Sequence, residues 1–577
     1  MIVDARKAEL PGRTAFDLVI VGAGAAGIAV ALALAKTRIT IALVEAGGDR
    51  FSAKEQEFYA SDDVVPETHS PAHLYRRRIL GGSTSIWGGR CIPFDPIDFE
   101  ARDWMAHARW PISHEDVVGY LPAAMQLAEG GLPEFDASRA LPGQPGPMVD
   151  GVPADEVILD RVERFSKPTH FGRAYRARLA KAERLTVFTH APVTQILVQH
   201  ESGHVRGVRI NAGGRFVDLA APRVVVAVGG IETARLLLAS NEARPLGLGN
   251  ESGLVGRFYQ CHIECQVGTL RFLVPPQSVR LDYALSHDAI YCRRYVWLSP
   301  KAQREHRLAG LVMRPEHPLI VDPAHRHPVL SAMYLVKNFI VPEYARKISA
   351  LEHLARAKYP SSYGYYGAHL RNIAFGTTQL ARFAFDWTRR RILAERKLPT
   401  VVLRDPRGIY PAAVTAEQEP NYDSRVLLGD SRDSLGMPRV AIDWRTTDAD
   451  YDRLAAGLRM ISQAFAASNS VRYEVEGADP QTLRGAVVPI AGHHIGTARM
   501  AESPATGVCN RNGEVFGVPG LYIAGAAVFP TSSFANPTLT LIALALRLAD
   551  HLRSGAHTLL SRSGTPPHVA IGPQYAF

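Results

Sequence analysis

Residues 16–45 of the chain read FDLVIVGAGAAGIAVALALAKTRITIALVE and decide the fold. Residues 16–21 form an apolar run broken only by Asp17, which is typical of a strand buried on both faces of a parallel sheet. Residues 25–36 are rich in alanine and leucine and predict a helix, and residues 39–44 predict a second strand. The stretch therefore predicts the first strand–helix–strand unit of a Rossmann-like α/β fold.

The turn between the first strand and the helix carries the motif Gly22-x-Gly24-x-x-Gly27. In dinucleotide-binding folds the first glycine allows a tight turn, the second lets backbone approach a pyrophosphate, and the third lets helix and strand pack closely. Glu45 ends the second strand, where a carboxylate accepts hydrogen bonds from ribose hydroxyls and repels a 2′-phosphate. The motif predicts a dinucleotide site and argues against NADP, but it does not choose between FAD and NAD.

Further strand–helix units lie far along the chain. Residues 223–228 predict a strand that is followed by a helix over 231–239, and residues 521–524 predict a strand ahead of a helix over 538–552. One nucleotide-binding domain assembled from separated segments explains this spacing. We predict that this FAD-binding domain comprises residues 14–100, 185–240 and 489–555.

The remaining segments, 101–184 and 241–488, are predicted to be substrate-binding and connecting regions with a largely antiparallel α+β sheet. Strand-like pieces at 329–336 and 439–443 and a helix at 448–467 support this interpretation. Residues from 554 onward are predicted to be irregular, with a C-terminal tail at 556–577.

Composition excludes several classes of protein. The 577 residues carry a formal charge of +9, but the 65 basic and 56 acidic residues are spread along the chain and no nucleic-acid-binding motif is present. The five cysteines are too few for a disulfide framework. His262 and Glu264 lie between Cys261 and Cys265, yet no second Cys/His pair stands at zinc spacing, so no metal site is expected.

The N-terminal residues lack the apolar core of a secretory signal. Two long uncharged stretches, 18–35 and 518–546, are interrupted by glycine or proline and are better interpreted as buried strand, turn and helix than as membrane spans. We therefore expect a soluble, cytoplasmic protein.

Two C-terminal segments indicate which cofactor the chain binds. Residues 492–500 read GHHIGTARM, and residues 515–552 read VFGVPGLYIAGAAVFPTSSFANPTLTLIALALRLADHL. With the N-terminal glycine motif and the loop GGSTSIWGG at 81–89, they make the chain resemble the glucose–methanol–choline (GMC) flavoprotein oxidoreductases over most of its length. Trp87 and Asn536-Pro537 resemble the pyranose oxidase and sugar dehydrogenase branch of that family.

The resemblance implies FAD as the cofactor. The residues expected to bind it are Gly22, Gly24, Ala25, Ala26, Gly27, Glu45, Ala46, Gly81, Gly82, Ser83, Thr84, Ser85, Trp87, Gly88, Val193, Ala227, Gly525, Ala526, Asn536, Pro537 and Thr538. Ser83 and Thr84 are expected to reach phosphate, and the helix that begins at Thr538 to direct its N-terminus at the flavin pyrimidine. Several relatives tether FAD through a histidine in the 81–89 loop; Ile86 stands at that position, so noncovalent binding is expected.

Oxidation of an alcohol by flavin needs a base for the hydroxyl proton, and imidazole suits this task near neutral pH. The resemblance assigns this role to His493 and places Asn536 beside the substrate oxygen, where its amide can hydrogen-bond the developing alkoxide. Asn536 can also cap the following helix. His494 is expected on the opposite face of an extended segment, in a structural role.

These residues favour FAD-dependent oxidation of an alcohol group of a sugar, aminosugar, glycoside or other polyol. The sequence names neither the alcohol nor the electron acceptor, for which oxygen, a quinone and a redox protein stay open. A non-redox lyase or decarboxylase with the same fold is a second interpretation, which His493 and Asn536 disfavour.

A third interpretation is a flavoprotein subunit of a membrane-associated dehydrogenase complex. It rests on residues 368–397, which mix apolar positions with arginines. We favour a lid or a substrate-domain helix for this stretch, so membrane association is the less favoured interpretation.

Overall fold

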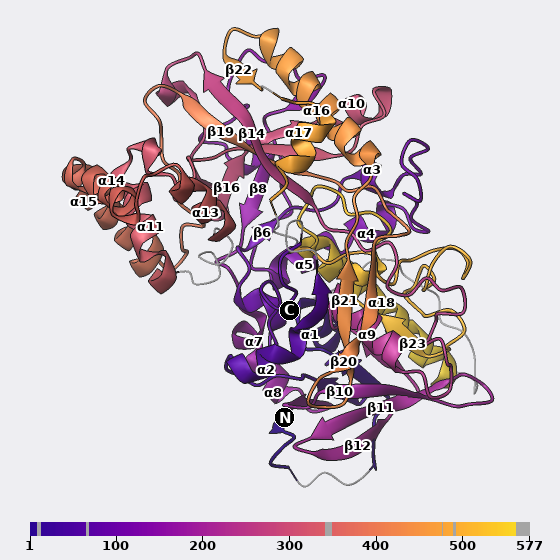
Figure 1. The fold of residues 1–577 in the computed structure, drawn as a ribbon. Coiled ribbons are helices and arrows are strands. Elements are labelled where there is room, and N and C mark those ends of the chain that lie inside the picture. The colour runs from indigo at the N-terminus through magenta and orange to yellow at the C-terminus, as the bar shows by residue number, and fades with distance from the viewer. Residues whose placement is uncertain (9–12, 65–68, 341–348, 476, 489–491, 561–577) are drawn as a thin grey trace.

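The computed structural model describes the chain except residues 9–12, 65–68, 341–348, 476, 489–491 and 561–577 (Figure 1). Its lower half in Figure 1 is built on a six-stranded sheet in which every neighbouring pair is parallel. In sheet order the strands are β1 (Ile2–Asp4), β9 (Leu185–Thr189), β4 (Ile41–Val44), β3 (Leu18–Val21), β13 (Val224–Val226) and β23 (Leu521–Ile523). The expected Rossmann-like α/β fold is confirmed, and β1 adds a strand that precedes residue 14.

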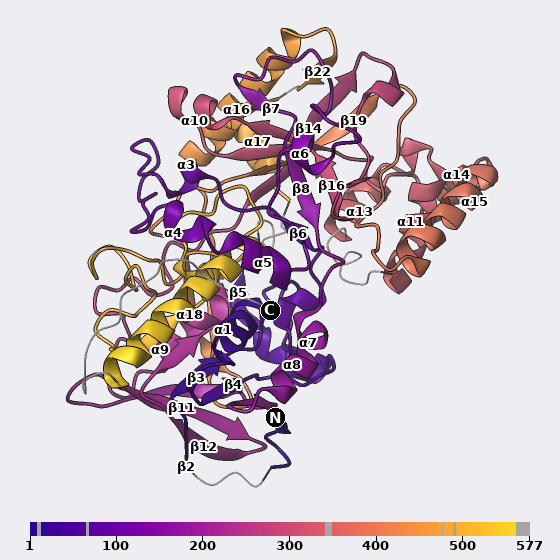
Figure 2. The same cartoon turned by 180° about the vertical axis from the view of Figure 1, so that it is seen from behind.

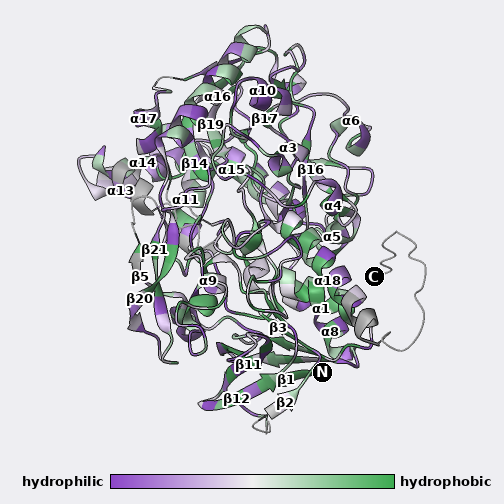
Figure 3. Cartoon of the chain, turned by 90° about the vertical axis from the view of Figure 1, so that its right-hand side faces the viewer, coloured by the Kyte–Doolittle hydropathy of each residue, from purple (hydrophilic) through white to green (hydrophobic). Residues whose placement is uncertain are grey.

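Two helices, α1 (Ala25–Leu34) and the C-terminal α18 (Thr538–Leu560), pack against each other beside this sheet (Figure 2). All residues of β3 and β4 are buried, as are eight of the ten residues of α1. A helix that is apolar on all sides is stable only where other elements cover it. Helix α1 is strongly hydrophobic in Figure 3, whereas α18 combines hydrophobic with hydrophilic segments.

The upper half of Figure 1 holds a six-stranded antiparallel sheet, as expected for the substrate-binding region. In sheet order its strands are β22 (Val471–Glu474), β14 (Ile263–Phe272), β19 (Ile409–Ala416), β18 (Leu311–Pro315), β17 (Val296–Leu298) and β7 (Val157–Ile158). The helix α16 (Asp448–Ala466) shares a hydrophobic core with this sheet, and its first turn is capped by the Thr447 side chain.

Three smaller sheets contain the remaining strands of the described part of the chain. They are β10 (Val193–Val198) with β11 (Val205–Ala212), β12 (Arg215–Ala220) and β2 (Arg13–Ala15); β15 (Ala284–Leu285) with β16 (Tyr291–Arg294), β8 (Val162–Phe165) and β6 (Arg90–Cys91); and β20 (Arg425–Arg432) with β21 (Pro438–Asp443) and β5 (Ser61–Val64).

Two predicted elements are wrong. Residues 329–336, expected to be strand-like, lie within helix α11 (Pro328–Ile340). The buried residues Val329, Leu330 and Tyr334 recur at helical spacing, and Pro328 occupies the first helical position. The irregular tail expected from residue 554 begins later, because α18 continues to Leu560; residues 561–577 lie outside the described part of the chain.

A group of helices leaves the antiparallel sheet between β18 and β19 and extends to one side of the molecule (Figure 1). We call it the helical arm. Its helices are α11, α13 (Ser349–Ala357), α14 (Ser362–Ala374), α15 (Thr377–Trp387) and a short π-helix (Thr388–Leu393). Among the described residues, no helix combines the length and hydropathy needed to cross a bilayer.

Candidate active site

A cavity of about 850 Å³ lies where the two large sheets meet. Val21, Val44, Ala227 and Ala524, at or just after the carboxyl ends of four parallel strands, line one side of it. Strands β14, β18 and β19 of the antiparallel sheet line the other side. Open α/β sheets bind ligands beyond the carboxyl ends of their strands, so the cavity occupies the position that the fold favours for a nucleotide.

Most of the residues predicted from the sequence line this single cavity. They are Gly22, Gly24, Ala25, Ala26, Glu45, Ala46, Gly82, Ser83, Thr84, Trp87, Gly88, Val193, Ala227, His493, Gly525, Ala526, Asn536, Pro537 and Thr538. Gly27, Gly81 and Ser85 do not line it. Gly27 and Gly81 pack behind the cavity wall at positions that have no room for a side chain. A Cβ on Gly27 would lie 1.9 Å from the Gly22 oxygen, and a Cβ on Gly81 would lie 2.4 Å from the Gly172 nitrogen. Ser85 donates its hydroxyl to the Gly82 oxygen at 2.9 Å.

The glycine motif makes a cradle of bare backbone. Gly22 has φ +98°, and a Cβ there would lie 2.6 Å from the Ala227 oxygen. A Cβ on Gly24, by contrast, would meet no atom within 4 Å, because it would enter the cavity. The space above Gly24 is therefore available to a group that must touch the backbone, as a pyrophosphate does.

Glu45 lies buried at the cavity wall with both carboxylate oxygens engaged. Oε2 accepts from the Ala23 amide and Oε1 from the Gly47 amide, each at 2.9 Å. Burial raises the pKa of this carboxyl to about 7, although the two backbone hydrogen bonds oppose the shift. Each oxygen keeps a second acceptor position, so Glu45 can bind ribose hydroxyls while it holds the turn.

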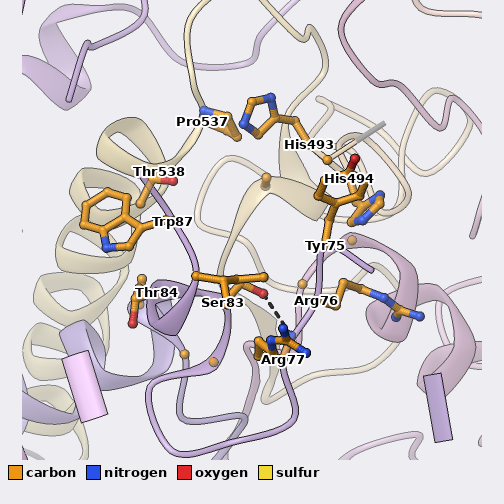
Figure 4. Close-up of a pocket in the computed structure, with 18 of the residues that line it drawn as sticks. Tyr75, Arg76, Arg77, Ser83, Thr84, Trp87, His493, His494, Pro537 and Thr538 are labelled. Atoms are coloured by element: carbon orange, nitrogen blue, oxygen red, sulfur yellow. Dashed lines mark hydrogen bonds between the residues drawn. The ribbon is translucent and has the colours of Figure 1, made fainter. Parts of the chain in front are cut away.

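The phosphate-side residues differ in part from expectation. The Thr84 hydroxyl donates to the Gly81 oxygen at 2.6 Å and accepts from the Phe171 amide at 3.0 Å, so it mainly supports the loop. Ser83 is exposed at the cavity and accepts from the Arg77 amide, as Figure 4 shows.

Sequence reasoning missed a basic run on this wall, residues 76–78. Arg78 Nε is buried and has no hydrogen-bond partner among the described residues. Arg78 lines the same cavity as the bare backbone of Gly22 and Gly24. An unpartnered guanidinium nitrogen in such a cavity fits an anionic group, so the residues present fit the phosphates of FAD.

His493 and Asn536 meet at the cavity, on the segment before the parallel sheet's last strand and at the start of α18. His493 Nε2 lies 3.1 Å from Asn536 Nδ2, and His493 Nδ1 lies 3.1 Å from Nδ1 of His262. His262 Nε2 faces the Ser532 carbonyl at 3.3 Å, which can only accept. Burial lowers the pKa of His262 to about 4, so this ring is neutral at pH 7.

These contacts assign the tautomers. Neutral His262 must carry its proton on Nε2 to donate to Ser532, which leaves its Nδ1 as an acceptor. His493 Nδ1–H therefore donates to His262, and the lone pair of His493 lies on Nε2, where the Asn536 amide donates to it. The hydrogen-bond chain places the basic nitrogen of His493 in the cavity.

Sequence reasoning also missed His262, because the segment from Cys261 to Cys265 was interpreted only as a metal clip that lacks its second half. The alternation of a strand is the signal that could have found it, since His262, Glu264 and Gln266 are two residues apart and all line the cavity.

The His494 ring diverges from that of His493 (Figure 4). His494 Nδ1 lies 2.6 Å from the Tyr259 hydroxyl, which also lies 2.7 Å from His69 Nε2. Burial lowers the pKa of His494 well below its ordinary value and that of His69 to about 4. The side chains of His494, Tyr259 and His69 therefore form an uncharged, hydrogen-bonded cluster on the side of the segment away from His493.

Comparison with known proteins agrees with this geometry. A family model described as FAD dependent oxidoreductase matches residues 17–332, more than half of the chain, and one described as GMC oxidoreductase matches residues 420–545. The chain belongs to the FAD-dependent oxidoreductases. Within that class it is a GMC-type flavoprotein, which confirms the resemblance inferred from its motifs.

Individual relatives cover the chain to different extents. Paromamine 6'-oxidase of Streptomyces fradiae is 24% identical over 608 residues, which cover 95% of this chain and 92% of that protein. C-glycoside 3-oxidase of Microbacterium trichothecenolyticum is 32% identical over 154 residues, but this match spans only 26% of this chain and 28% of that relative's length. An FAD-dependent oxidoreductase from Chaetomium thermophilum shares the fold, with a TM-score of 0.52, 14% identity, and 94% of this chain and 100% of that chain covered.

Proposed function

We propose that the protein uses FAD to oxidise an alcohol group of a sugar, aminosugar, glycoside or other polyol to a carbonyl. The observation that carries the proposal is the His493–Asn536 pair, held 3.1 Å apart in the cavity that the glycine cradle also lines. Two relatives named as oxidases of paromamine and of C-glycosides support the substrate class.

In this proposal FAD, when bound, supplies the acceptor for the two electrons and the carbon-bound hydrogen of the alcohol. His493 takes the hydroxyl proton at Nε2, because its Nδ1–H is engaged with His262. Asn536 Nδ2–H, which donates to His493 in the structure, donates to the substrate oxygen as negative charge develops there. Polar groups of Glu264, Gln266 and Arg314 on the facing wall can hold the other hydroxyl or amino groups of a polyol.

Anaerobic mixing of the holoenzyme with a panel of aminosugars, glycosides and simple alcohols tests this function. At least one alcohol is expected to bleach the visible absorbance of the oxidised flavin, with the matching carbonyl as product. Turnover of a substrate without bleaching would instead indicate a lyase or decarboxylase.

Noncovalent cofactor binding is the first prediction. Ile86 lines the cavity where a tethering histidine stands in some relatives, and its side chain has no nucleophile. Acid precipitation of the holoenzyme should therefore release yellow FAD into the supernatant. Flavin that stays with the pellet after washing would show a covalent attachment elsewhere.

Replacing Glu45 by alanine is expected to weaken FAD retention by about 1–3 kcal/mol, the cost of losing hydrogen bonds to a charged group. The variant also leaves the Ala23 and Gly47 amides without their acceptor. Glu45→Gln is the matched control, because it keeps one acceptor oxygen and should retain more flavin. Dilution followed by fluorescence of released FAD measures the difference; an alanine variant that stays fully loaded would contradict the role.

His262 is proposed as a positioning residue that fixes the tautomer of His493. His262→Leu removes the acceptor for His493 Nδ1–H and should slow flavin reduction about tenfold, which corresponds to one lost hydrogen bond. His262→Gln should restore part of the rate, because its amide oxygen can accept. The pH profile of anaerobic reduction is the decisive readout, since it should shift in the leucine variant and a merely structural defect would leave it in place.

A further inference from the structure

The helical arm exposes large apolar side chains at an unusual density. Six of them are more than half exposed within residues 363–393, against five in the rest of the described chain. They are Tyr363, Leu370, Phe375, Phe385, Ile392 and Leu393, with Phe375 88% and Leu393 77% exposed. We call this set, together with the arginines described below, the apolar–basic surface. Soluble surfaces seldom gather so many such side chains unless another body covers them.

The arm leaves this surface without a partner in the described part of the chain. Helix α15 has no fully buried residue. It packs on α11 and α14. Its half-buried residues Leu380, Phe383 and Trp387 recur at helical spacing and form the side of the helix that faces the protein. Phe385 lies off that side and is 74% exposed.

The charge around the apolar side chains is strongly positive. Residues 362–397 contain seven arginine and lysine residues and only two acidic ones, Asp386 and Glu395. Arg371, Arg382 and Arg389 are exposed and form no ion pair with any described residue. The arm therefore offers free cations next to exposed apolar rings, which is the composition of helices that lie in the headgroup region of anionic bilayers.

We propose that the apolar–basic surface docks the enzyme on an anionic lipid bilayer, with Phe375, Phe385 and Leu393 entering the headgroup–acyl boundary. A second copy of the chain is disfavoured as the occupant, because a two-fold contact would bring this positive surface onto itself. The chain as a whole also carries +9, which adds long-range attraction to anionic lipid.

Docking of the arm also determines where the cavity lies relative to the lipid. The chain enters the arm after Leu319 and returns from it at Thr400, and both residues line the cavity. The arm is thus rooted at the cavity rim, and a docked arm holds that rim close to the lipid surface.

Co-sedimentation of the full-length holoenzyme with vesicles tests the proposal. Vesicles of phosphatidylcholine alone are compared with vesicles of three parts phosphatidylcholine to one part phosphatidylglycerol, at low and high salt. We expect binding to the anionic vesicles that weakens with salt, and little binding to the neutral ones. Failure of the wild-type protein to bind anionic vesicles at low salt would overturn the proposal.

Three sets of variants locate the surface. The triple variant Phe375→Ser, Phe385→Ser, Leu393→Ser should lower the partition coefficient more than tenfold. Arg371→Gln, Arg382→Gln and Arg389→Gln should each lower it about fivefold. The control Phe216→Ser, Leu246→Ser, Leu285→Ser removes similarly exposed apolar side chains from outside the arm and should leave binding unchanged.

Thermal unfolding and light scattering complete the test. Because the replaced side chains are exposed, the melting temperature of each variant should match that of the wild type. Equal vesicle binding by the serine triple variant and the control would overturn the assignment. A wild-type dimer that the serine triple variant converts to a monomer, without vesicle binding by either, would assign the surface to self-association and also overturn it.

Discussion

Replacing His493 by alanine is expected to slow flavin reduction by the alcohol about 10²–10⁴-fold, the usual effect of removing a positioned general base. The hydrogen-bond chain from Ser532 through His262 places the lone pair of His493 on Nε2, beside Asn536. Without that nitrogen, the hydroxyl proton has no acceptor in the position that the structure provides. Rapid anaerobic mixing isolates this half-reaction from the electron acceptor.

His494→Ala is the matched control, because it removes an adjacent imidazole that faces the Tyr259 cluster instead. We expect this variant to lose stability or FAD affinity more than rate. His493→Ala should keep its bound FAD. The assignment fails if His493→Ala reduces its flavin at the wild-type rate, and the two roles are reversed if only His494→Ala is impaired.

Asn536→Ala should slow flavin reduction by about 10–10³-fold, since one hydrogen-bond donor to a developing oxyanion contributes at most about 10²–10³. The Asn536 amide is the group that lies 3.1 Å from the basic nitrogen of His493, so its loss removes the donor that orients the substrate oxygen. The comparison of Asn536→Ala with wild type uses the same anaerobic mixing.

Asn536→His serves as the conservative variant, because an imidazole N–H can replace the amide donor, whereas Asn536→Asp cannot donate when ionised. Reduction rates should fall in the order wild type, histidine, then alanine and aspartate. Equal rates for all four would show that Asn536 takes no part in orienting the substrate.

Local patterns were sufficient for the nucleotide-binding part of the molecule. The strand, the glycine turn and the helix at residues 16–36 follow each other directly in the sequence, and Gly27 tolerates no Cβ because one would lie 1.9 Å from the Gly22 oxygen of the same turn. For the same reason the fold class, the flavin cofactor and the family follow from short motifs and their order along the chain. His493 and Asn536 lie on different segments and both line the cavity. Their roles, as general base and as hydrogen-bond donor to the substrate oxygen, stay predictions.

Where residues distant in sequence must meet, only the tertiary structure decided. His262 lies 231 positions before His493, and nothing in the segment between Cys261 and Cys265 shows that its ring would set a tautomer. Ser85 was expected at the cofactor, but the short helix that carries it turns its hydroxyl onto Gly82.

The helical arm shows the same limit. Its apolar residues and arginines are visible in the sequence, yet residues 329–336 were mistaken for a strand. A sequence shows which side chains are apolar, but whether they are covered depends on which elements pack around them. The sequence therefore determined the nucleotide-binding fold and its chemistry through short-range sterics and motif order. The tertiary structure alone decided the hydrogen-bond chain that orients His493 and which apolar side chains of the arm stay exposed.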